Sequence, residues 1–573
     1  MLPLTEKELI INKTTKLLKK IKSFSTIRFI LAILIIIFGI CFLSLNLDII
    51  YLILAIAILT VLIGFIIMTN PFYNELKSLR NLELVIKKHE NRRNLTYSSF
   101  TPDGREYVNY DDYKVLDLDL LGPRSLYQYL CVAKSSLGKE KLAKQLTEPV
   151  KKEEKFSKCV KTLAEDNNYF HLEAAIFSSS AEAKECKNEE ILGITSKKIK
   201  ISSLGLSLMV LSYLALVVAT ILLVLNGLPL YYLLFFIPLN FIIARKFSNN
   251  EVYALNATKY ANLFTSYLEL EKALEKIDIK DPYYNELKSI LKNQLPNLVK
   301  FKKLFEMLSY RKNIIFSIIA NGIIYADYIL ALHFNLTTRK MESIEDSLEA
   351  IAELELVLSL ATIGVDNECY SIPLAGDHLA IKDGYHPLVK NCVSNDLELN
   401  GGTILTGSNM SGKTTFMRMI GINQVLANAG GLVCAKEFVT NDFIVLTSLR
   451  ANDMLQEGIS TFYAEIKRMK KIVEISKGDN VLVLVDEIFK GTNAKDRIYA
   501  SFEIIKKLNS FNANFIITTH DFELCEAKNI VNYHFDEEYQ NDLIYFDYKI
   551  KEGKCNKTNA LYLLRMAGVL EDN

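Results

Sequence analysis

Two glycines, a lysine and a threonine stand at a fixed spacing in the stretch TGSNMSGKTTFMR, residues 406–418. They fit the pattern Gly407-x-x-x-x-Gly412-Lys413-Thr414, which is typical of a loop that wraps phosphate groups. In such a loop the glycines let backbone N–H groups surround the phosphates, the lysine reaches the β and γ oxygens, and the threonine hydroxyl can bind Mg²⁺. The sequence therefore predicts a site for ATP and Mg²⁺. The expected nucleotide contacts in the loop are Gly407, Ser408, Asn409, Met410, Ser411, Gly412, Lys413, Thr414 and Thr415.

Two acidic residues end a later apolar run, VLVLVDE, residues 481–487. Asp486 is placed to bind Mg²⁺ together with Thr414, and Glu487 is placed to polarise an attacking water. A further run, NFIITTH, ends in His520, where a side chain could sense the γ-phosphate. A single histidine is more often structural, but together with Lys413 and Glu487 it is a candidate catalytic residue. These residues predict hydrolysis of ATP and not only its binding.

The elements around these residues must bring them to one edge of a sheet. From about residue 401 short β-branched runs (TILT, FIVLTSL, VLVLVDE and NFIITTH) alternate with helical stretches, and the loop lies between TILT and the helical run KTTFMRMIGINQVLA. This alternation predicts an α/β domain with a largely parallel sheet. Because the carboxyl ends of parallel strands meet at one edge, the loop and the two acidic residues are expected to lie close together.

Several motifs in this region, taken in order, resemble those of the MutS mismatch-repair ATPases. TGSNMSGKTTFMR, GISTFYAEI (458–466), DEIFKGTNAKD (486–496) and THDFEL (519–524) each match a segment of that family. Residues 116–150, which end in LTEPV, resemble the start of the family's helical core. The resemblance is closest to membrane-spanning relatives, because a hydrophobic hairpin and its basic flank fill residues 1–100 in place of a mismatch-reading domain.

The resemblance implies an ABC-type, MutS-like ATPase domain that works as a homodimer. Gly458 and Ser460 would then contact the nucleotide of the partner copy, although a helix-capping role for Ser460 fits equally well. Cys392 occupies the position of an aromatic residue that stacks on adenine in many relatives, and Tyr548 is the candidate replacement. The family also implies binding of mismatched or branched DNA.

Length and composition bound these expectations. The chain has 573 residues, which favours two or more domains, and 67 Lys and Arg nearly balance 66 Asp and Glu. No global positive field therefore favours nucleic acid, although the basic flank between Lys77 and Arg93 could contact the phosphates of nucleic acid or of anionic lipid. Hydrophobic residues make up 50% and the mean hydropathy is +0.15, values that indicate segments in lipid. Nine scattered cysteines indicate neither a disulfide framework nor a zinc site.

Two pairs of uncharged apolar runs predict two transmembrane hairpins. The first pair covers about 29–45 and 49–68, and the second about 203–225 and 229–245. Lys and Arg flank both pairs on the side opposite their short turns, for example Lys19, Lys20, Arg80 and Arg245. By the positive-inside rule the protein is expected in the cell membrane as a multi-pass protein, with both termini and the ATPase domain in the cytoplasm.

Residues 313–332 are almost apolar enough for a fifth span, but Asn321 and Asp327 interrupt them. An unpaired Asp in lipid costs about 3 kcal/mol, which favours a buried soluble helix here. Long helical patterns on both sides of this stretch, such as YLELEKALEKI and SLEAIAELELVLSLA, predict a lever or bundle that joins the membrane part to the ATPase domain, or a plain structural bundle.

The expected organisation is a mostly α-helical core or lever with two transmembrane hairpins, followed by the α/β P-loop ATPase domain. The divisions are 1–100 for the basic segment and first hairpin, 101–202 for the first part of the core, 203–245 for the second hairpin, 246–365 for the second part of the core, and 366–573 for the ATPase domain. Two alternatives to a DNA-acting ATPase remain open: an ATP-driven membrane transporter and a nucleotide-gated membrane scaffold.

Overall fold

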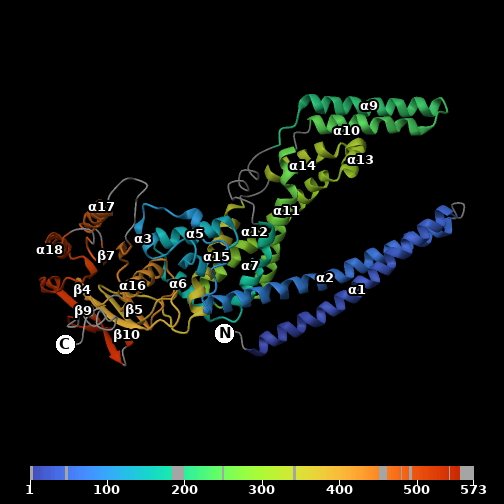
Figure 1. Cartoon of the computed structure of the whole chain (residues 1–573). Coiled ribbons are helices and arrows are strands. Elements are labelled where there is room, and N and C mark those ends of the chain that lie inside the picture. Colours follow the sequence, from blue (N-terminus) through green and yellow to red (C-terminus); the bar gives the residue numbers. More distant parts are fainter. Residues whose placement is uncertain are drawn as a thin grey trace.

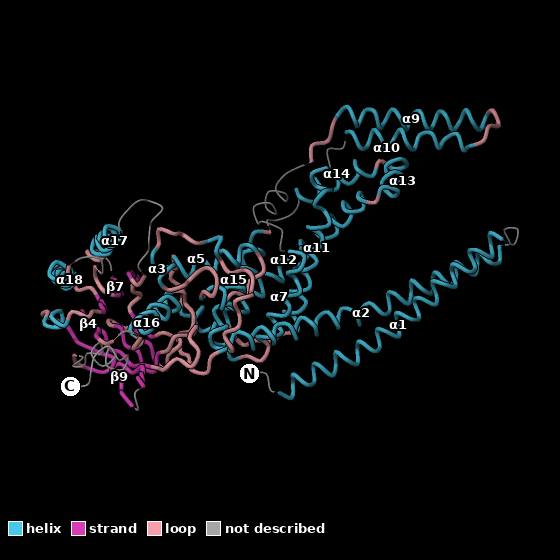
Figure 2. The backbone as a smooth tube through the Cα atoms, in the orientation of Figure 1, coloured by secondary structure: helices cyan, strands magenta, loops and turns pink. Residues whose placement is uncertain are grey.

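The computed structural model describes most of the chain, namely residues 4–44, 49–183, 199–247, 251–339, 344–408, 410–450, 461–478, 480–489, 493–540 and 543–554. An α/β domain lies at one end, a helical core lies in the middle, and two groups of helices extend from the core at the other end (Figure 1). Figure 2 shows that the strands are confined to the C-terminal domain. This arrangement agrees with the expected order of a helical region followed by an α/β domain.

The C-terminal domain contains a six-stranded sheet in the order β10-β9-β4-β8-β7-β6. Its strands are β4 (Gly402–Thr406), β6 (Ile444–Ser448), β7 (Val481–Asp486), β8 (Asn514–Thr518), β9 (Ile530–Gln540) and β10 (Leu543–Glu552). All neighbouring pairs are parallel except β10 and β9, which are antiparallel. The prediction of a largely parallel sheet is confirmed, and β4, β6, β7 and β8 coincide with the four predicted runs.

Helices cover both faces of this sheet: α16 (Lys413–Asn428) on one side, α17 (Thr461–Ile475) and α18 (Ala494–Ser510) on the other. The side chains of β7 alternate between the two faces, as the pleat of a strand requires. Leu482 and Leu484 belong to the core that contains α16 and the helical region, whereas Val481, Val483 and Val485 pack with residues of α17 and α18. Burial on both faces explains why the strand is apolar without interruption.

A smaller sheet, ordered β1-β5-β2-β3, contains three strands that precede the nucleotide loop in the chain and one, β5, that follows it. Its strands are β1 (Leu374–Ala375), β2 (Leu379–Gly384), β3 (Asn395–Leu399) and β5 (Glu437–Thr440). The connection between β2 and β3 carries residues 385–394 to the edge of the nucleotide loop.

The helical core is built around α15, whose residues are buried along almost its whole length and which packs against α5, α6 and α12. Its α-helices are α3 (Tyr113–Asp117), α4 (Leu126–Leu130), α5 (Ser136–Thr147), α6 (Glu154–Glu165), α7 (Tyr169–Ala183), α11 (Glu251–Lys276), α12 (Pro282–Ser309) and α15 (Glu345–Asp366). Short 3-10 helices are η1 (Arg105–Tyr107), η3 (Tyr310–Lys312) and, in the α/β domain, η5 (Phe522–Glu526). One continuous apolar core joins these helices to the α16 side of the sheet.

The first hairpin consists of two very long helices, α1 (Leu4–Ser44) and α2 (Ile49–Arg93), which pack along each other. The apolar part of α2 is exposed, but its last turns enter the helical core, where Leu82, Val85 and His89 are buried. Arg92 is also buried and donates from Nε to the carbonyl oxygen of Tyr129 at 2.7 Å. Within the basic flank that was considered for contact with phosphates, Arg92 is therefore not available.

The second hairpin contains α9 (Ser203–Leu225), the 3-10 helix η2 (Leu230–Phe235) and α10 (Phe236–Phe247). A single return helix from residue 229 to 245 was expected, but the α-helix begins only at Phe236. Pro238 lies in the first turn of α10, where the missing N–H donor costs no hydrogen bond within the helix.

Three of the described helices, α1, α2 and α9, are long and apolar enough to cross a membrane. Residues 313–332 do not form the single buried helix that was expected. They form α13 (Ile314–Ile324) and most of α14 (Ala326–Arg339), which meet at an angle of 84°. Many apolar side chains of this bent pair are exposed, and Asp327 is not unpaired, because it lies 2.9 Å from Nε of Arg311.

Candidate nucleotide site

The glycine-rich loop connects the end of β4 to the start of α16 and requires glycine at two positions. Gly407 and Gly412 have φ values of 145° and 103°, in the region that favours glycine. A Cβ atom on Gly407 would lie 2.9 Å from the carbonyl oxygen of Phe535, and one on Gly412 would lie 3.1 Å from a ring carbon of Tyr548. The spacing that defines the sequence pattern is therefore also required by the fold.

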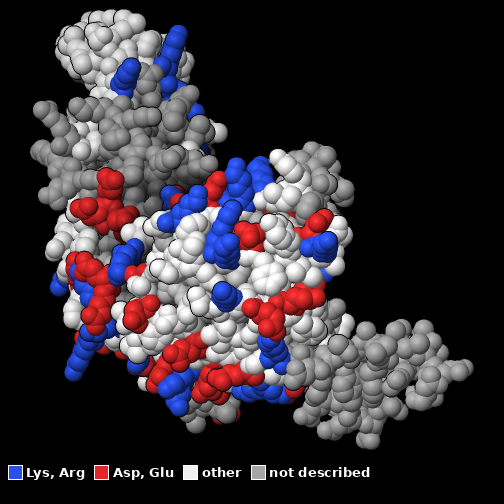
Figure 3. All heavy atoms as spheres, turned by 90° about the vertical axis from the view of Figure 1, so that its left-hand side faces the viewer, with Lys and Arg blue, Asp and Glu red and all other residues white. Residues whose placement is uncertain are grey.

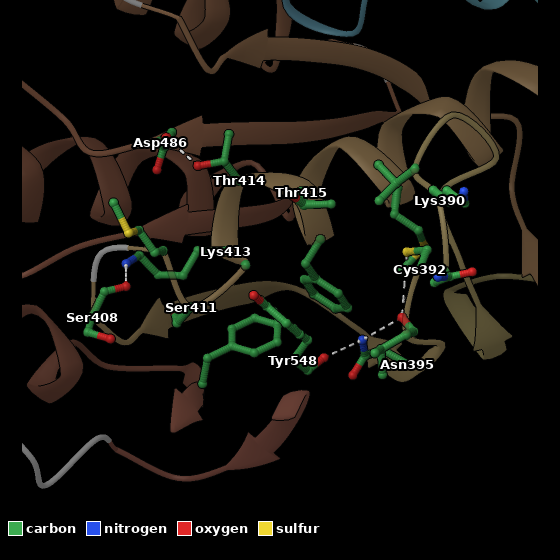
Figure 4. A pocket seen from close by; sticks show the side chains of 18 of the residues that line it. Lys390, Cys392, Asn395, Ser408, Ser411, Lys413, Thr414, Thr415, Asp486 and Tyr548 are labelled. Atoms are coloured by element: carbon green, nitrogen blue, oxygen red, sulfur yellow. Dashed lines mark hydrogen bonds between the residues drawn. The ribbon is translucent and has the colours of Figure 1, made fainter. Parts of the chain in front are cut away.

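The loop forms one wall of a pocket of about 590 Å³ (Figure 4). Asp486 and Glu487 close one end of this pocket, and the segment between Val389 and Asn395 closes the other. Of the predicted loop contacts, Ser408, Met410, Ser411, Gly412, Lys413, Thr414 and Thr415 line the pocket. Its size and its mixed polar and apolar lining suit a small ligand such as a nucleotide.

Two side chains of the loop carry the features expected for phosphate binding. The ammonium group of Lys413 donates to the carbonyl oxygens of Gly407 and Ser408 at 2.7 and 2.8 Å, so it lies directly against the loop. The hydroxyl oxygen of Ser411 is buried and has no hydrogen-bond partner among the described residues. A phosphate oxygen would satisfy such a donor, and the first turn of α16 adds free backbone N–H groups.

The two predicted magnesium ligands are brought into contact. Thr414 Oγ1 donates to Asp486 Oδ2 at 2.9 Å, although the two residues are far apart in sequence. Both are hard oxygen ligands of the kind that Mg²⁺ prefers. No cluster of three or more His, Cys, Asp or Glu residues that could hold a metal occurs in the described parts of the chain. Mg²⁺ is usually held by one or two protein oxygens together with phosphates and water, and Thr414 and Asp486 supply two such oxygens.

Glu487 follows Asp486 in a left-handed backbone conformation, with φ at 59°, which is uncommon for a residue other than glycine. The hydroxyl of Thr518 fixes this turn, because it donates to Asp486 Oδ1 at 2.6 Å and accepts from the backbone N–H of Glu487 at 3.1 Å. The carboxylate of Glu487 then lies 3.3 Å from Nε2 of His520. The three predicted catalytic residues, Lys413, Glu487 and His520, thus come from α16 and from the ends of the neighbouring strands β7 and β8.

Tyr548 and Cys392, the two residues considered for contact with adenine, both line the pocket (Figure 4). The ring of Tyr548 covers Gly412 at the start of α16. Asn395 fixes the backbone around Tyr548, since its Nδ2 donates to the carbonyl oxygen of Tyr548 at 3.0 Å and its Oδ1 accepts from the N–H of Ile550 at 2.8 Å. The aromatic residues that line this pocket are Phe416 of α16, Phe535 of β9 and Tyr548 of β10, and none comes from the segment that contains Cys392.

Thr518, Asn395 and Glu537 are among the residues of the site that were not predicted. Glu537 is buried at 1% exposure and accepts a hydrogen bond from the hydroxyl of Ser408. Thr518 was visible in the sequence, because it lies in the same strand end as His520. Glu537 gave no comparable signal, since only the pairing of β9 beside β4 brings it to the loop. Asn395 is the first residue of β3 in the smaller sheet and meets the site through its contacts with Tyr548 and Ile550 of β10.

Three predicted contacts, Asn409, Gly458 and Ser460, lie outside the described residues. The helix expected after the GISTF segment is α17, which begins at Thr461, directly after Ser460.

Comparison with known proteins agrees with this geometry. Residues 403–572 match the family model described as MutS domain V. The chain is 30% identical over 253 residues to the DNA mismatch repair protein MutS of Caldicellulosiruptor saccharolyticus, which covers 41% of this chain and 29% of that protein. It is 31% identical over 238 residues to the MutS protein of Thermus aquaticus, covering 40% and 29%. It is 30% identical over 231 residues to the MutS protein homolog 4 of Mus musculus, covering 37% and 24%.

These alignments span less than a third of each relative's length. The glycine-rich loop, the acidic end of β7 and the six-stranded sheet all belong to the C-terminal domain that these alignments include. Through this C-terminal domain the chain belongs to the MutS family.

Proposed function

We propose that the protein is a membrane-anchored, MutS-like ATPase that hydrolyses ATP in a dimeric site and uses the reaction to change the arrangement of its helical core. The observation that carries this proposal is the contact between Thr414 and Asp486 beside Lys413 and Glu487. Two oxygen ligands, a cation and a carboxylate converge on one pocket, and this is the set of groups that phosphoryl transfer to water requires.

The roles of these residues follow from their chemistry. Lys413 would contact the β- and γ-phosphates, and Mg²⁺ held by Thr414 and Asp486 would neutralise negative charge on them. Glu487 would orient and polarise the attacking water, because its carboxylate lies at the end of β7 where the pocket closes. His520 contacts Glu487 and would position that carboxylate or sense the γ-phosphate.

Dimer formation is proposed from the family resemblance and from the position of α17. In this arrangement the segment containing Gly458 and Ser460 would reach the γ-phosphate held by the partner copy. α17 begins directly after Ser460, so its N-terminus would point toward an anion across the interface. Closure of two ATPase domains on ATP would then move each helical core relative to the other.

Membrane anchoring is proposed from the length and composition of α1, α2 and α9. In the most apolar 18-residue stretch of each helix, 0%, 0% and 6% of the residues are buried within the structure. These exposed apolar side chains need another apolar environment. With the Lys and Arg residues at their inner ends, the rule of positive charges inside places both termini and the ATPase domain in the cytoplasm. The second hairpin then returns through η2 and α10.

DNA binding is proposed only from the relatives, which are named for DNA mismatch repair. On the face of the C-terminal domain shown in Figure 3, Lys and Arg side chains are interspersed with Asp and Glu, and areas without these charged residues lie between them. A mixed surface of this kind suits contact with a second protein surface better than contact with a phosphate backbone. Whether the protein binds DNA, and which DNA structure it binds, therefore has to be determined by experiment.

ATPase measurements on the full chain in detergent test the proposal. We expect Mg²⁺-dependent hydrolysis, and we expect Lys413→Ala to abolish it while Lys470→Ala, on an exposed part of α17, leaves it unchanged. Undiminished hydrolysis by Lys413→Ala would refute the assignment of the site. The same assay with perfectly paired, mismatched and branched DNA separates the functions: stimulation by one of them supports a role on DNA, and indifference to all three favours a transporter or scaffold.

A further inference from the structure

The bent pair α13–α14 exposes an unusual amount of apolar surface for helices that begin and end at the helical core. Ile314 and Ile315 are 71% and 72% exposed. Further exposed apolar side chains on the pair are Phe316, Ile319, Ile323, Ile324, Ile329, Leu332 and Leu336. A continuous apolar surface of this kind marks contact with a membrane or another apolar partner.

This surface continues onto the second hairpin. α13 packs along α10, and α14 contacts α10 at its other end (Figure 1). Small residues allow the close approach: a Cβ on Gly322 of α13 would lie 2.8 Å from the carbonyl oxygen of Ile237 in α10, and one on Gly205 of α9 would lie 2.9 Å from Cζ of Tyr328 in α14. Close packing at glycine is typical of helices that associate in lipid. The bent pair and the second hairpin therefore form one unit.

The bend itself is built so that its backbone groups are satisfied inside this unit. Tyr325, with φ at 47°, is completely buried. The carbonyl oxygens of Gly322 and Ile323 accept hydrogen bonds from Asn240 Nδ2 and from the Tyr213 hydroxyl, both at 2.9 Å. A broken helix can lie at membrane depth only when its free backbone groups find partners in the protein, and α9 and α10 supply them here.

Asp327, whose charge disfavours a position in lipid, has a counter-charge inside the protein. Asp327 pairs with Arg311, and the two side chains are 2% and 4% exposed. Its backbone N–H donates to Asn321 Oδ1 at 2.8 Å, so both interrupting residues, Asn321 and Asp327, face the inside of the unit. Charged residues in membrane segments are found in such interior pairs.

The topology determines how the pair can meet a bilayer. α12 leads into α13 and α15 follows α14, and α12 and α15 pack against each other in the helical core. The chain thus leaves the core at Ser309 and returns to it from Ile344 on. A complete crossing would place the two helices on opposite sides of the membrane, which their contact forbids.

We propose that α13 and α14 form a re-entrant hairpin: it enters the bilayer from the cytoplasmic side beside α9 and α10, turns at Tyr325 and leaves on the same side. The exposed apolar side chains would contact lipid acyl chains. This inference rests on the membrane anchoring proposed above and adds a segment to it that is not a span.

Single cysteines placed in the full chain, with the native cysteines replaced, test this topology in inside-out and right-side-out vesicles. We expect a membrane-impermeant maleimide to label Lys312→Cys and Asp346→Cys only from the cytoplasmic side. Ile315→Cys and Ile319→Cys should not be labelled from either side of the membrane and should be labelled only after detergent is added. The matched control is Val299→Cys, an exposed apolar position on α12 that is 46% exposed and should be labelled from the cytoplasmic side without detergent.

Two other labelling results would contradict the re-entrant hairpin. Labelling of Lys312→Cys and Asp346→Cys from opposite sides would show a fifth span, and labelling of Ile319→Cys like Val299→Cys would show a cytoplasmic surface; both overturn the re-entrant hairpin. Gly227→Cys, in the turn of the second hairpin, reports on the anchoring itself: if it is not labelled from the outside, membrane anchoring by this hairpin fails as well. If the cysteine-free chain does not fold, a benzophenone amino acid at Ile319 should cross-link to phospholipid, whereas one at Val299 should not. Equal cross-linking at the two positions would contradict the proposal.

Discussion

The guanidinium of Arg468 on α17 is buried against the carboxylate of Asp117 at the end of α3, with side-chain exposures of 5% and 1%. Asp117 also accepts from the backbone N–H of Leu449 at 2.9 Å and from that of Arg450 at 3.2 Å. Asp119, two residues later, accepts from Arg418 of α16 at 3.0 Å. The first segment of the helical core is thus attached both to the helix that follows the glycine-rich loop and to the helix that begins directly after Ser460. This is a direct mechanical connection between the nucleotide site and the core.

Asp117→Asn should destabilise the protein strongly. The substitution leaves a buried guanidinium without its counter-charge, and loss of one partner of a buried pair costs about 3–5 kcal/mol. A lower midpoint of thermal unfolding in detergent is the expected result. The control is Lys470→Ala on α17, the helix that carries Arg468. Lys470 pairs with Glu474, the two side chains are 74% and 57% exposed, and this pair should contribute nothing measurable to stability. If the two variants unfold at the same temperature, Asp117 does not hold the two parts together.

Glu487→Gln should keep nucleotide binding and lose turnover. The amide has nearly the same shape but cannot act as a base, and a positioned general base contributes about 10²–10⁴-fold to a rate. Single-turnover hydrolysis together with binding of a fluorescent ATP analogue measures the two effects separately. His520→Ala should lower the rate less, because His520 acts through its contact with Glu487. Normal turnover by Glu487→Gln would mean that another group activates the water.

Tyr548→Ala should weaken ATP binding more than any change at Cys392. Stacking of a base on an aromatic ring contributes about 1–3 kcal/mol, and Tyr548 supplies an aromatic ring beside the loop. The dissociation constant of the fluorescent ATP analogue should rise for Tyr548→Ala and stay near the original value for Tyr548→Phe and Cys392→Ser. The opposite ranking would place the adenine against the Cys392 segment.

The sequence predicted the parts of the site that depend on local patterns. The glycine-rich loop, the apolar strands and their acidic ends each lie within a short stretch, and their order along the chain was enough to place Thr414 beside Asp486. Asn395 and Glu537 could not be predicted, because strand order in space brings them to the loop. The bend at Tyr325 was missed for a related reason: hydropathy does not reveal that Arg311 pairs with Asp327 or that α9 and α10 satisfy the broken backbone.

The last prediction concerns the place where the first hairpin enters the core. His89 of α2 lies between two carboxylates, with Nε2 2.6 Å from Glu173 and Nδ1 2.7 Å from Asp366. Burial alone would raise the pKa of Glu173, but the positive charges of His89 and Arg92 outweigh it and lower this pKa to about 2. The ordinary pKa of a glutamate is about 4.3, so the pair stabilises the fold fully above that pH and loses its contribution as the pH falls toward 2.

Glu173→Gln should therefore destabilise the protein by about 3–5 kcal/mol at neutral pH, because it removes one of the two carboxylates that neutralise the buried positive charges of His89 and Arg92. The difference between the original protein and the variant should shrink as the pH is lowered from about 4 toward 3. Thermal unfolding and hydrogen exchange of α2 and α7, measured across this pH range, check both statements. Glu154→Gln, which changes an exposed carboxylate on α6, is the control and should show no such difference. A destabilisation by Glu173→Gln that is the same at all pH values would mean that shape, and not charge, holds α2 in the core.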